Sequence, residues 1–223
     1  MATRHKEEKT QMERALIAAK LSAQAYKTEK QAKAATKKMG FPWCKLISRD
    51  GAECLVVKDR NDLWFAFRGT EPSKLNDVMA DLNLIKNAAK AGGKVHSGFQ
   101  QEVNDLWMDI LSEIEHNQQL KVQKDIYMTG HSLGAAMATI AATRHQPHEL
   151  FTFGSPRVGG PKFIRHIKCP HLRFMNNNDI VCRIPPAWLG FKHHGEMIYF
   201  GRNGNKQPKP TWEDRLFGVL NAW

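Results

Sequence analysis

One short stretch restricts the fold of this chain more than any other: a glycine-flanked serine between an apolar run and an alanine-rich run. Residues 126–129 have the pattern of a buried strand, Gly130-His131-Ser132-Leu133-Gly134 contains the serine, and residues 133–143 have the pattern of a small-residue helix. At so tight a corner the glycines relieve clashes, and the serine side chain projects above the sheet. The helix that starts after Ser132 directs its positive dipole end toward the same point. We therefore expect Ser132 to be a nucleophile.

The other strand and helix patterns alternate along the chain and predict an α/β fold. Strand-like runs occupy residues 45–47, 54–58, 63–67, 126–129, 150–154, 172–176 and 197–200. The turn residues Arg60-Asn61-Asp62 predict a hairpin between the second and third of these runs. Helical patterns cover residues 98–117, 133–143 and 161–167. We therefore expect a mostly parallel sheet with helices on both faces.

Two further helical patterns lie at the ends of the chain. Residues 7–38 contain no Gly or Pro and predict one N-terminal amphipathic helix within residues 1–40, packed on the domain or extending from it. An apolar stripe predicts a C-terminal helix at about 211–223. The length of 223 residues suits a single domain. We assign that domain to residues 41–223.

The charge of the chain is unevenly distributed. Lysine and arginine outnumber acidic residues 33 to 22, for a net charge of +11. Residues 1–38 carry +6, residues 39–156 carry −2 and residues 157–209 carry +8. No nucleic-acid-binding motif accompanies this charge, so we expect no nucleic acid partner. Peripheral contact with an anionic membrane surface accounts for it better.

The sequence also restricts the location and the cofactors. No run reaches the roughly 18 apolar residues of a spanning helix, and residues 1–10 lack the apolar core of a secretory signal. We expect a cytoplasmic protein, in part peripheral to a membrane. The four cysteines lack metal-ligand spacing, so we expect buried thiols, no metal and no cofactor. The sequence favours no particular oligomeric state.

A serine nucleophile needs a base, and the base needs an orienting carboxylate. In α/β hydrolases the chain order is serine, acid, histidine. Asp179 follows the strand-like run 172–176 directly, where carboxyl-end loops present functional groups. The adjacent His193 and His194 come 14 residues later, and either can be the base on this reasoning.

Six motifs in order resemble the class 3 lipases, the family of fungal triacylglycerol lipases and their relatives. They cover about residues 60–200 and are Phe67-Arg68-Gly69-Thr70, Val95-His96-Ser97-Gly98-Phe99, Thr129-Gly130-His131-Ser132-Leu133-Gly134, Phe153-Gly154-Ser155-Pro156-Arg157-Val158-Gly159, Asn178-Asp179-Ile180-Val181 with Ile184-Pro185-Pro186, and Gly190-Phe191-Lys192-His193. The resemblance implies the α/β-hydrolase fold.

The resemblance also implies roles for individual residues. Ser132 would be the nucleophile, Asp179 the orienting acid and His193 the base, in preference to His194. The oxyanion hole would be formed by the backbone N–H of Leu133 and by Thr70. A lid would cover the site at about residues 71–93.

The leading hypothesis is a serine ester hydrolase that cleaves acyl esters of lipids through an acyl-enzyme. A phospholipase A1-like activity and a soluble short-chain esterase are alternatives within this class. A non-catalytic lipase-like scaffold is the alternative of another class; the presence of Ser132, Asp179, His193 and Thr70 weakens it.

Overall fold

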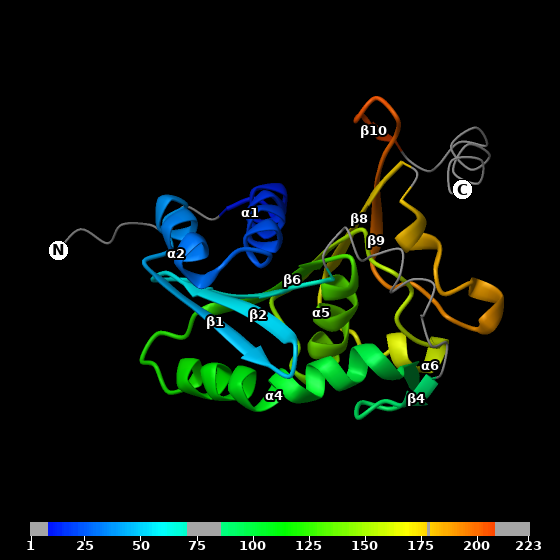
Figure 1. Ribbon diagram of the computed structural model, residues 1–223, viewed down its shortest axis with the longest axis horizontal. Helices are drawn as coiled ribbons and strands as arrows, with labels where there is room; N and C mark the ends of the chain where they lie inside the picture. Colours follow the sequence, from blue (N-terminus) through cyan, green and yellow to red (C-terminus); the bar gives the residue numbers. More distant parts are fainter. Residues whose placement is uncertain (1–8, 71–85, 178, 208–223) are drawn as a thin grey trace.

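The computed structural model contains one central sheet of eight strands with helices on both faces (Figure 1). It describes residues 9–70, 86–177 and 179–207. The strand order is β1-β2-β3-β6-β7-β8-β9-β10. The strands are β1 (Trp43–Arg49), β2 (Ala52–Lys58), β3 (Asp62–Phe67), β6 (Asp125–His131), β7 (Glu149–Phe153), β8 (His171–Asn176), β9 (Glu196–Phe200) and β10 (Lys206–Gln207).

The centre of the sheet is parallel. Strands β3, β6, β7, β8 and β9 pair in parallel, and antiparallel partners flank them on both sides. The predicted mostly parallel sheet is confirmed, and so is the hairpin, which pairs β2 with β3. All five parallel strands end at the same edge, where functional loops of such sheets gather.

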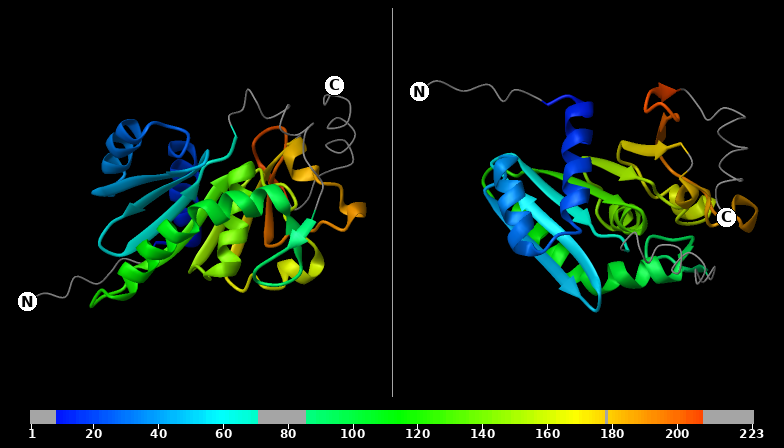
Figure 2. Two further views of the ribbon diagram at one scale, coloured as in Figure 1. Left: turned by 60° about the horizontal axis from the view of Figure 1, so that its bottom comes forward. Right: turned by 45° about the horizontal axis from the view of Figure 1, so that its top comes forward.

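Helices cover the two faces separately (Figure 2). One face carries α1 (Gln11–Gln24) and α2 (Glu29–Lys38), and the other carries α4 (Ser97–Gln118), α5 (Leu133–Arg144) and α6 (Pro161–Ile164). Leu21 of α1 packs with Trp64 and Phe151 in one apolar core. Val103 and Met137 belong to the core on the opposite face. No described helix is long and apolar enough to cross a membrane.

The expectation of one helix over residues 7–38 is wrong, because α1 and α2 are separate. Thr28 accepts a hydrogen bond from the backbone N–H of Gln31, and the Gln31 side chain accepts one from the Thr28 N–H. This capping box starts a new helix. The turn between the helices places Tyr26 near the sheet, where its hydroxyl reaches His131.

Part of the expected lid has no helical structure. Residues 86–93 form strand β4 (Lys86–Ala88) and a turn into β5 (Lys94–His96), which pairs with β4. Residues 71–85 lie outside the described residues, and so does the segment 211–223. The lid and the C-terminal helix therefore stay predictions.

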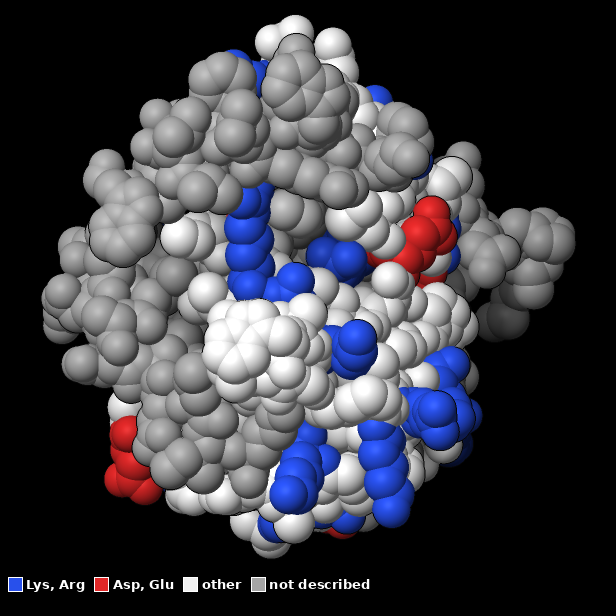
Figure 3. Space-filling view, turned by 90° about the vertical axis from the view of Figure 1, so that its right-hand side faces the viewer, with Lys and Arg blue, Asp and Glu red and all other residues white. Residues whose placement is uncertain are grey.

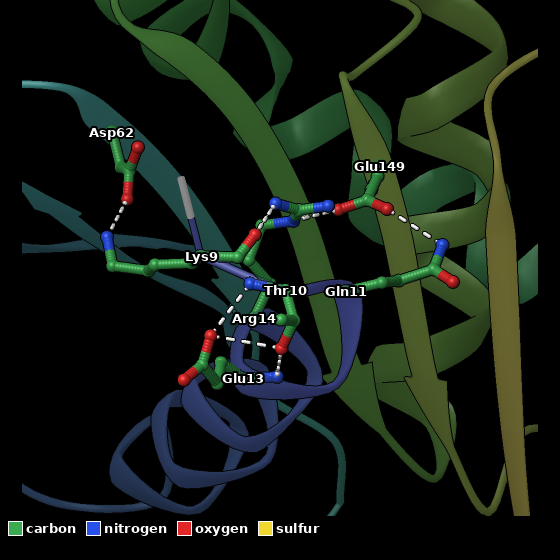
Figure 4. Close-up of polar contacts among 7 residues, drawn as sticks. All are labelled: Lys9, Thr10, Gln11, Glu13, Arg14, Asp62 and Glu149. Atoms are coloured by element: carbon green, nitrogen blue, oxygen red, sulfur yellow. Dashed lines mark hydrogen bonds and ion pairs between the residues drawn. The ribbon is translucent and has the colours of Figure 1, made fainter. Parts of the chain in front are cut away.

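Polar contacts hold the first turn of α1 on the sheet (Figure 4). Glu149 of β7 forms an ion pair with Arg14 and accepts a hydrogen bond of 2.8 Å from Gln11. Lys9 pairs with Asp62 at the start of β3 at 2.6 Å. Glu149 is buried. Because a buried carboxylate needs such partners, these contacts fix the position of α1 over β6 and β7.

We expect Glu149→Ala to lower the free energy of unfolding by about 3 kcal/mol, since it leaves Arg14 without its buried counter-charge. Urea unfolding followed by circular dichroism measures the loss. Glu29→Ala is the matched control, because it removes an exposed pair with Lys33, and such a pair contributes less than about 0.5 kcal/mol. Equal losses in the two variants would contradict the anchoring role of Glu149.

Candidate active site

Ser132 lies at the corner between β6 and α5, in a backbone conformation that non-glycine residues rarely adopt. Its φ is 56° and its ψ is −127°. Its N–H donates to the carbonyl oxygen of Phe153 at 2.9 Å. The Oγ atom is buried and has no hydrogen-bond partner within the described residues. Strain at a nucleophile together with an unused hydroxyl is typical of an active-site serine.

The glycines around Ser132 allow three backbones to approach closely. A Cβ on Gly130 would overlap the backbone of Gly134, and a Cβ on Gly134 would overlap the carbonyl oxygen of Phe67. A Cβ on Gly69 would lie 3.1 Å from the Gly134 nitrogen. The end of β3 therefore runs directly past the start of α5.

The two residues expected to form an oxyanion hole flank this close approach. Leu133 is the first residue of α5, so its N–H has no acceptor within the helix. Thr70 follows Gly69 and is partly exposed. Leu133 therefore belongs to α5, and Thr70 belongs to the segment that follows β3. These two segments meet at Ser132.

Asp179 follows β8 at the same edge of the sheet. Its Oδ1 accepts a hydrogen bond of 3.0 Å from the Val181 N–H at the start of the short helix η2 (Ile180–Arg183). A Cβ on Gly154 would lie 2.5 Å from Oδ2. Gly154 follows β7, the strand between β6 and β8. The end of β7 therefore separates Ser132 from Asp179.

His131 lies near Asp179. The carboxylate of Asp179 opposes the effect of burial, which lowers the pKa of His131. Nδ1 of His131 lies 3.0 Å from the Tyr26 hydroxyl. His131 therefore has a hydrogen-bonding contact with the segment between α1 and α2.

His193 does not lie with Asp179. Its Nε2 lies 2.8 Å from the Cys182 carbonyl oxygen, and no hydrogen bond joins it to Asp179 or Ser132. Burial, with Arg173 and Arg157 nearby, lowers the pKa of His193 to about 3. A catalytic base has to become a cation, and two arginines oppose that. The expected contact between Asp179 and His193 is therefore absent.

The register of the sheet explains where this histidine pair lies. His193 and His194 come just before β9, and β9 pairs in parallel with β8 from Leu172 onward. Residues before a parallel strand lie at its amino end, opposite the edge that carries Ser132. Nδ1 of His194 lies 3.1 Å from Nδ1 of the buried His171, the first residue of β8.

A cavity of about 890 Å³ opens beside Asp179. Its wall is formed by Met12, Leu16 and Ala19 of α1 and by side chains at the ends of β7, β8 and β9, namely Phe153, Phe174 and Phe200. Asp179 and His131 also line it. The carboxylate therefore faces a largely apolar space.

No group of three or more His, Cys, Asp or Glu side chains in the described part of the chain could hold a metal ion. The four cysteines are buried free thiols. Arg157 braces a loop, since it donates to the carbonyl oxygens of Arg183 and Pro185.

Residues 64–188 match the family described as "Lipase (class 3)". The chain belongs to the class 3 lipase family. It is 29% identical over 175 residues to a lipase of Rhizomucor miehei, and the matched region covers 72% of this chain and 48% of that lipase. It is 28% identical over 163 residues to a secreted mono- and diacylglycerol lipase of Malassezia restricta, and the matched region covers 65% of this chain and 52% of that lipase.

The fold is also that of solved lipases. A triacylglycerol lipase whose catalytic centre is formed by a serine protease triad superposes with a TM-score of 0.69 and 25% identity, over 89% of this chain and 84% of that one. The α/β-hydrolase fold is thus confirmed. The chain spans about half the length of the curated relatives that it matches.

The sequence did not identify Tyr26 as part of the site. In the sequence, Tyr26 lies within the N-terminal amphipathic pattern of residues 7–38. Its contact with His131 joins residues 105 positions apart, and no local pattern predicts such a pairing. A polar tip at the end of an apolar stripe is the one signal available, because a buried tyrosine hydroxyl usually has a partner.

Proposed function

We propose that this class 3 lipase is a serine ester hydrolase that cleaves acyl esters of lipids through an acyl-enzyme. The observation that carries the proposal is the strained backbone of Ser132 at the strand-to-helix corner, with an Oγ that no described residue binds. Strain of this kind costs about 1–3 kcal/mol and persists where function requires it.

The reaction assigns each group one task. An imidazole removes the proton from Ser132 Oγ while Oγ bonds to the ester carbonyl carbon, and the Leu133 N–H and Thr70 stabilise the oxyanion. The carbonyl re-forms, the C–O bond to the alcohol breaks, and the imidazolium returns the proton to the alcohol. Water then adds to the acyl-enzyme by the same route and releases the fatty acid.

Asp179 would orient this imidazole and stabilise its cationic form. We do not assign His193 as the base, because it contacts the Cys182 carbonyl and lies near two arginines.

The apolar walls of the cavity beside Asp179 support a lipid ester as substrate. Phe153, Phe174 and Phe200 would contact hydrocarbon rather than a polar group. A phospholipase A1-like activity shares this requirement. A soluble short-chain esterase would leave most of the 890 Å³ unused.

The scaffold alternative has one specific observation in its favour. The expected base His193 contacts the Cys182 carbonyl oxygen, and His131, which lies near Asp179, is already in contact with Tyr26. A chain that never acquires a base at this position would bind lipids without cleaving them.

Hydrolysis of p-nitrophenyl esters across acyl lengths, comparing the wild type with Ser132→Ala, tests the proposal. The assay is run with and without imidazole in the buffer. We expect turnover that falls at least about 10³-fold in Ser132→Ala, with a preference for long acyl chains. Absence of Ser132-dependent turnover on every ester, in both buffers, would favour the scaffold.

We further propose that an anionic membrane surface is the partner of the basic segment 157–209. Trp188 in the short helix η3 (Ala187–Leu189) is 83% exposed. Lys162 and Lys192 are both exposed. Their segments are neighbours because a β-bridge joins Lys192 to Gly159. Lysine and arginine side chains gather on this face, and acidic ones lie near its edges (Figure 3). An exposed tryptophan among cations suits anionic headgroups.

Replacing Trp188 by alanine is expected to weaken binding to anionic vesicles about tenfold, because the indole no longer enters the headgroup layer. Vesicle sedimentation in low and high salt measures this, and salt should weaken the wild type. Met108→Ala is the control, since Met108 is 72% exposed on α4. Equal binding to neutral and anionic vesicles would contradict the proposal.

A cytoplasmic location, as expected from the sequence, also stays a proposal, although the matched lipase of Malassezia restricta is a secreted one. Cell fractionation with an antibody against the chain distinguishes the two locations.

A further inference from the structure

Arg173, the third residue of β8, is a buried cation on the face of the sheet opposite α1. Its side chain alternates along the strand with those of Leu172 and Phe174, which belong to the core beneath α1. Arg173 is 7% exposed, and its Nε has no hydrogen-bond partner within the described residues. A buried arginine normally pairs with an anion, because an unpaired charge in the interior is costly.

No carboxylate in the described part of the chain balances the charge of Arg173. The groups that act on it are the Cys182 thiol and the Arg157 guanidinium. Burial raises the pKa of the thiol, so Cys182 is neutral at neutral pH. Arg157 is a second cation and donates to the carbonyl oxygens of Arg183 and Pro185. Burial lowers the pKa of Arg173, but arginine stays protonated in proteins, so two positive charges lie here without a negative one.

The histidines beside Arg173 do not change this balance. Nε2 of His193 lies 2.8 Å from the Cys182 carbonyl oxygen, which can only accept, so this nitrogen carries a proton. Burial, together with Arg173 and Arg157, lowers the pKa of His193 to about 3. Burial also lowers the pKa of His171. Both imidazoles are therefore neutral at neutral pH, and the excess positive charge remains.

A small cavity adjoins Arg173 at the amino end of β8. None of the residues that line it is acidic, and two of them, Arg173 and Lys192, are cations. The hydroxyl groups of Thr139 and Ser155 also line it, but each donates to a backbone carbonyl oxygen. The space accommodates about one particle of the size of a water molecule. Lys192 is exposed, so the cavity lies close to the surface, beside a second cation.

We propose that this cavity binds a single chloride ion, held by Arg173. Chloride is only slightly larger than a water molecule and supplies the negative charge that the buried guanidinium lacks. Phosphate and carboxylate groups are larger than the space. The cations Lys192 and Arg157 raise the local concentration of anions. The proposal is independent of ester hydrolysis, so failure of either one leaves the other standing.

Thermal unfolding in sodium chloride and in sodium gluconate at equal ionic strength tests the proposal. Gluconate screens surface charges to the same extent, but it is too large for the cavity. A ligand that binds only the folded state raises the unfolding midpoint. We expect the wild type to unfold at least about 3 °C higher in about 0.2 M chloride than in gluconate. The midpoint should rise stepwise as chloride replaces gluconate.

Neutral variants of Arg173 locate the effect. Arg173→Met and Arg173→Gln both remove the positive charge, and we expect both to lose the difference between the two salts. Two variants are used so that the test survives if one of them does not fold. Arg165→Met is the matched control, because it removes an exposed arginine of the same basic segment. This control should keep the full chloride effect.

Chloride NMR linewidths measure binding directly and do not depend on unfolding. The wild type and Arg165→Met should broaden the chloride signal, and added bromide should reverse the broadening by competition. The Arg173 variants should leave the signal narrow.

Two results would overturn the inference. One is an equal unfolding midpoint of the wild type in chloride and gluconate, which would mean that the cavity holds water only. The other is a chloride effect that the Arg173 variants retain in full, which would place the binding on the outer surface.

Discussion

Replacing Ser132 by glycine is expected to raise the free energy of unfolding by about 1 kcal/mol and to abolish Ser132-dependent hydrolysis. The stabilisation comes from the backbone, because a φ of 56° with a ψ of −127° is unfavourable for serine and is readily adopted by glycine. The hydroxyl that is removed has no hydrogen bond to lose within the described residues. Stability and activity should therefore change in opposite directions at this one position.

Urea unfolding and ester hydrolysis on the same preparations measure both effects. Ser155→Gly is the matched control, because Ser155 is equally buried, donates to the Pro156 carbonyl oxygen and has no positive φ. We expect this control to lose stability through the added backbone freedom and the lost hydrogen bond. A loss of stability in Ser132→Gly as large as that in Ser155→Gly would show that the corner is not strained.

The sequence predicted the corner around Ser132 because every determinant is local. The strand, the two glycines and the small-residue helix occupy fewer than twenty consecutive positions, and each has its own pattern. Asp179 was also found from the sequence, since it follows a strand and the carboxyl ends of parallel strands share one edge. Its side chain does lie at that edge, next to Gly154.

The place of His193 depends on pairing between distant segments, which the sequence alone does not reveal. Lys192 bonds to Gly159, and β9 begins beside Leu172, so the segment before β9 lies at the amino end of β8. A histidine shortly before a parallel strand lies at the opposite edge from a serine that follows one.

The two N-terminal helices show a different limit of the sequence. Residues 7–38 contain no Gly or Pro, so composition predicts no break between residues 25 and 28. The break depends on Thr28 and Gln31 forming a capping box and on Tyr26 reaching His131 over the sheet. A local helix-start signal and one tertiary contact together outweighed the continuous helix propensity.

The largest loss of stability is expected for Gly134→Ala, at least about 4 kcal/mol. The added Cβ would overlap the Phe67 carbonyl oxygen and lie 2.8 Å from backbone atoms of Arg68 and Gly69. None of these atoms belongs to a side chain that can rotate away, so either β3 or α5 has to move. Because that movement also displaces Ser132 from Thr70, ester hydrolysis should fall with stability.

Gly98→Ala is the matched control for this prediction, since it makes the same change near the start of α4. There a Cβ would lie 3.4 Å from the His96 ring, which is ordinary contact. Alanine is a better helix former than glycine, so this variant should be neutral or up to about 1 kcal/mol more stable. If Gly134→Ala unfolds at the same urea concentration as Gly98→Ala, the close approach of β3 to α5 is not what holds the nucleophile in place.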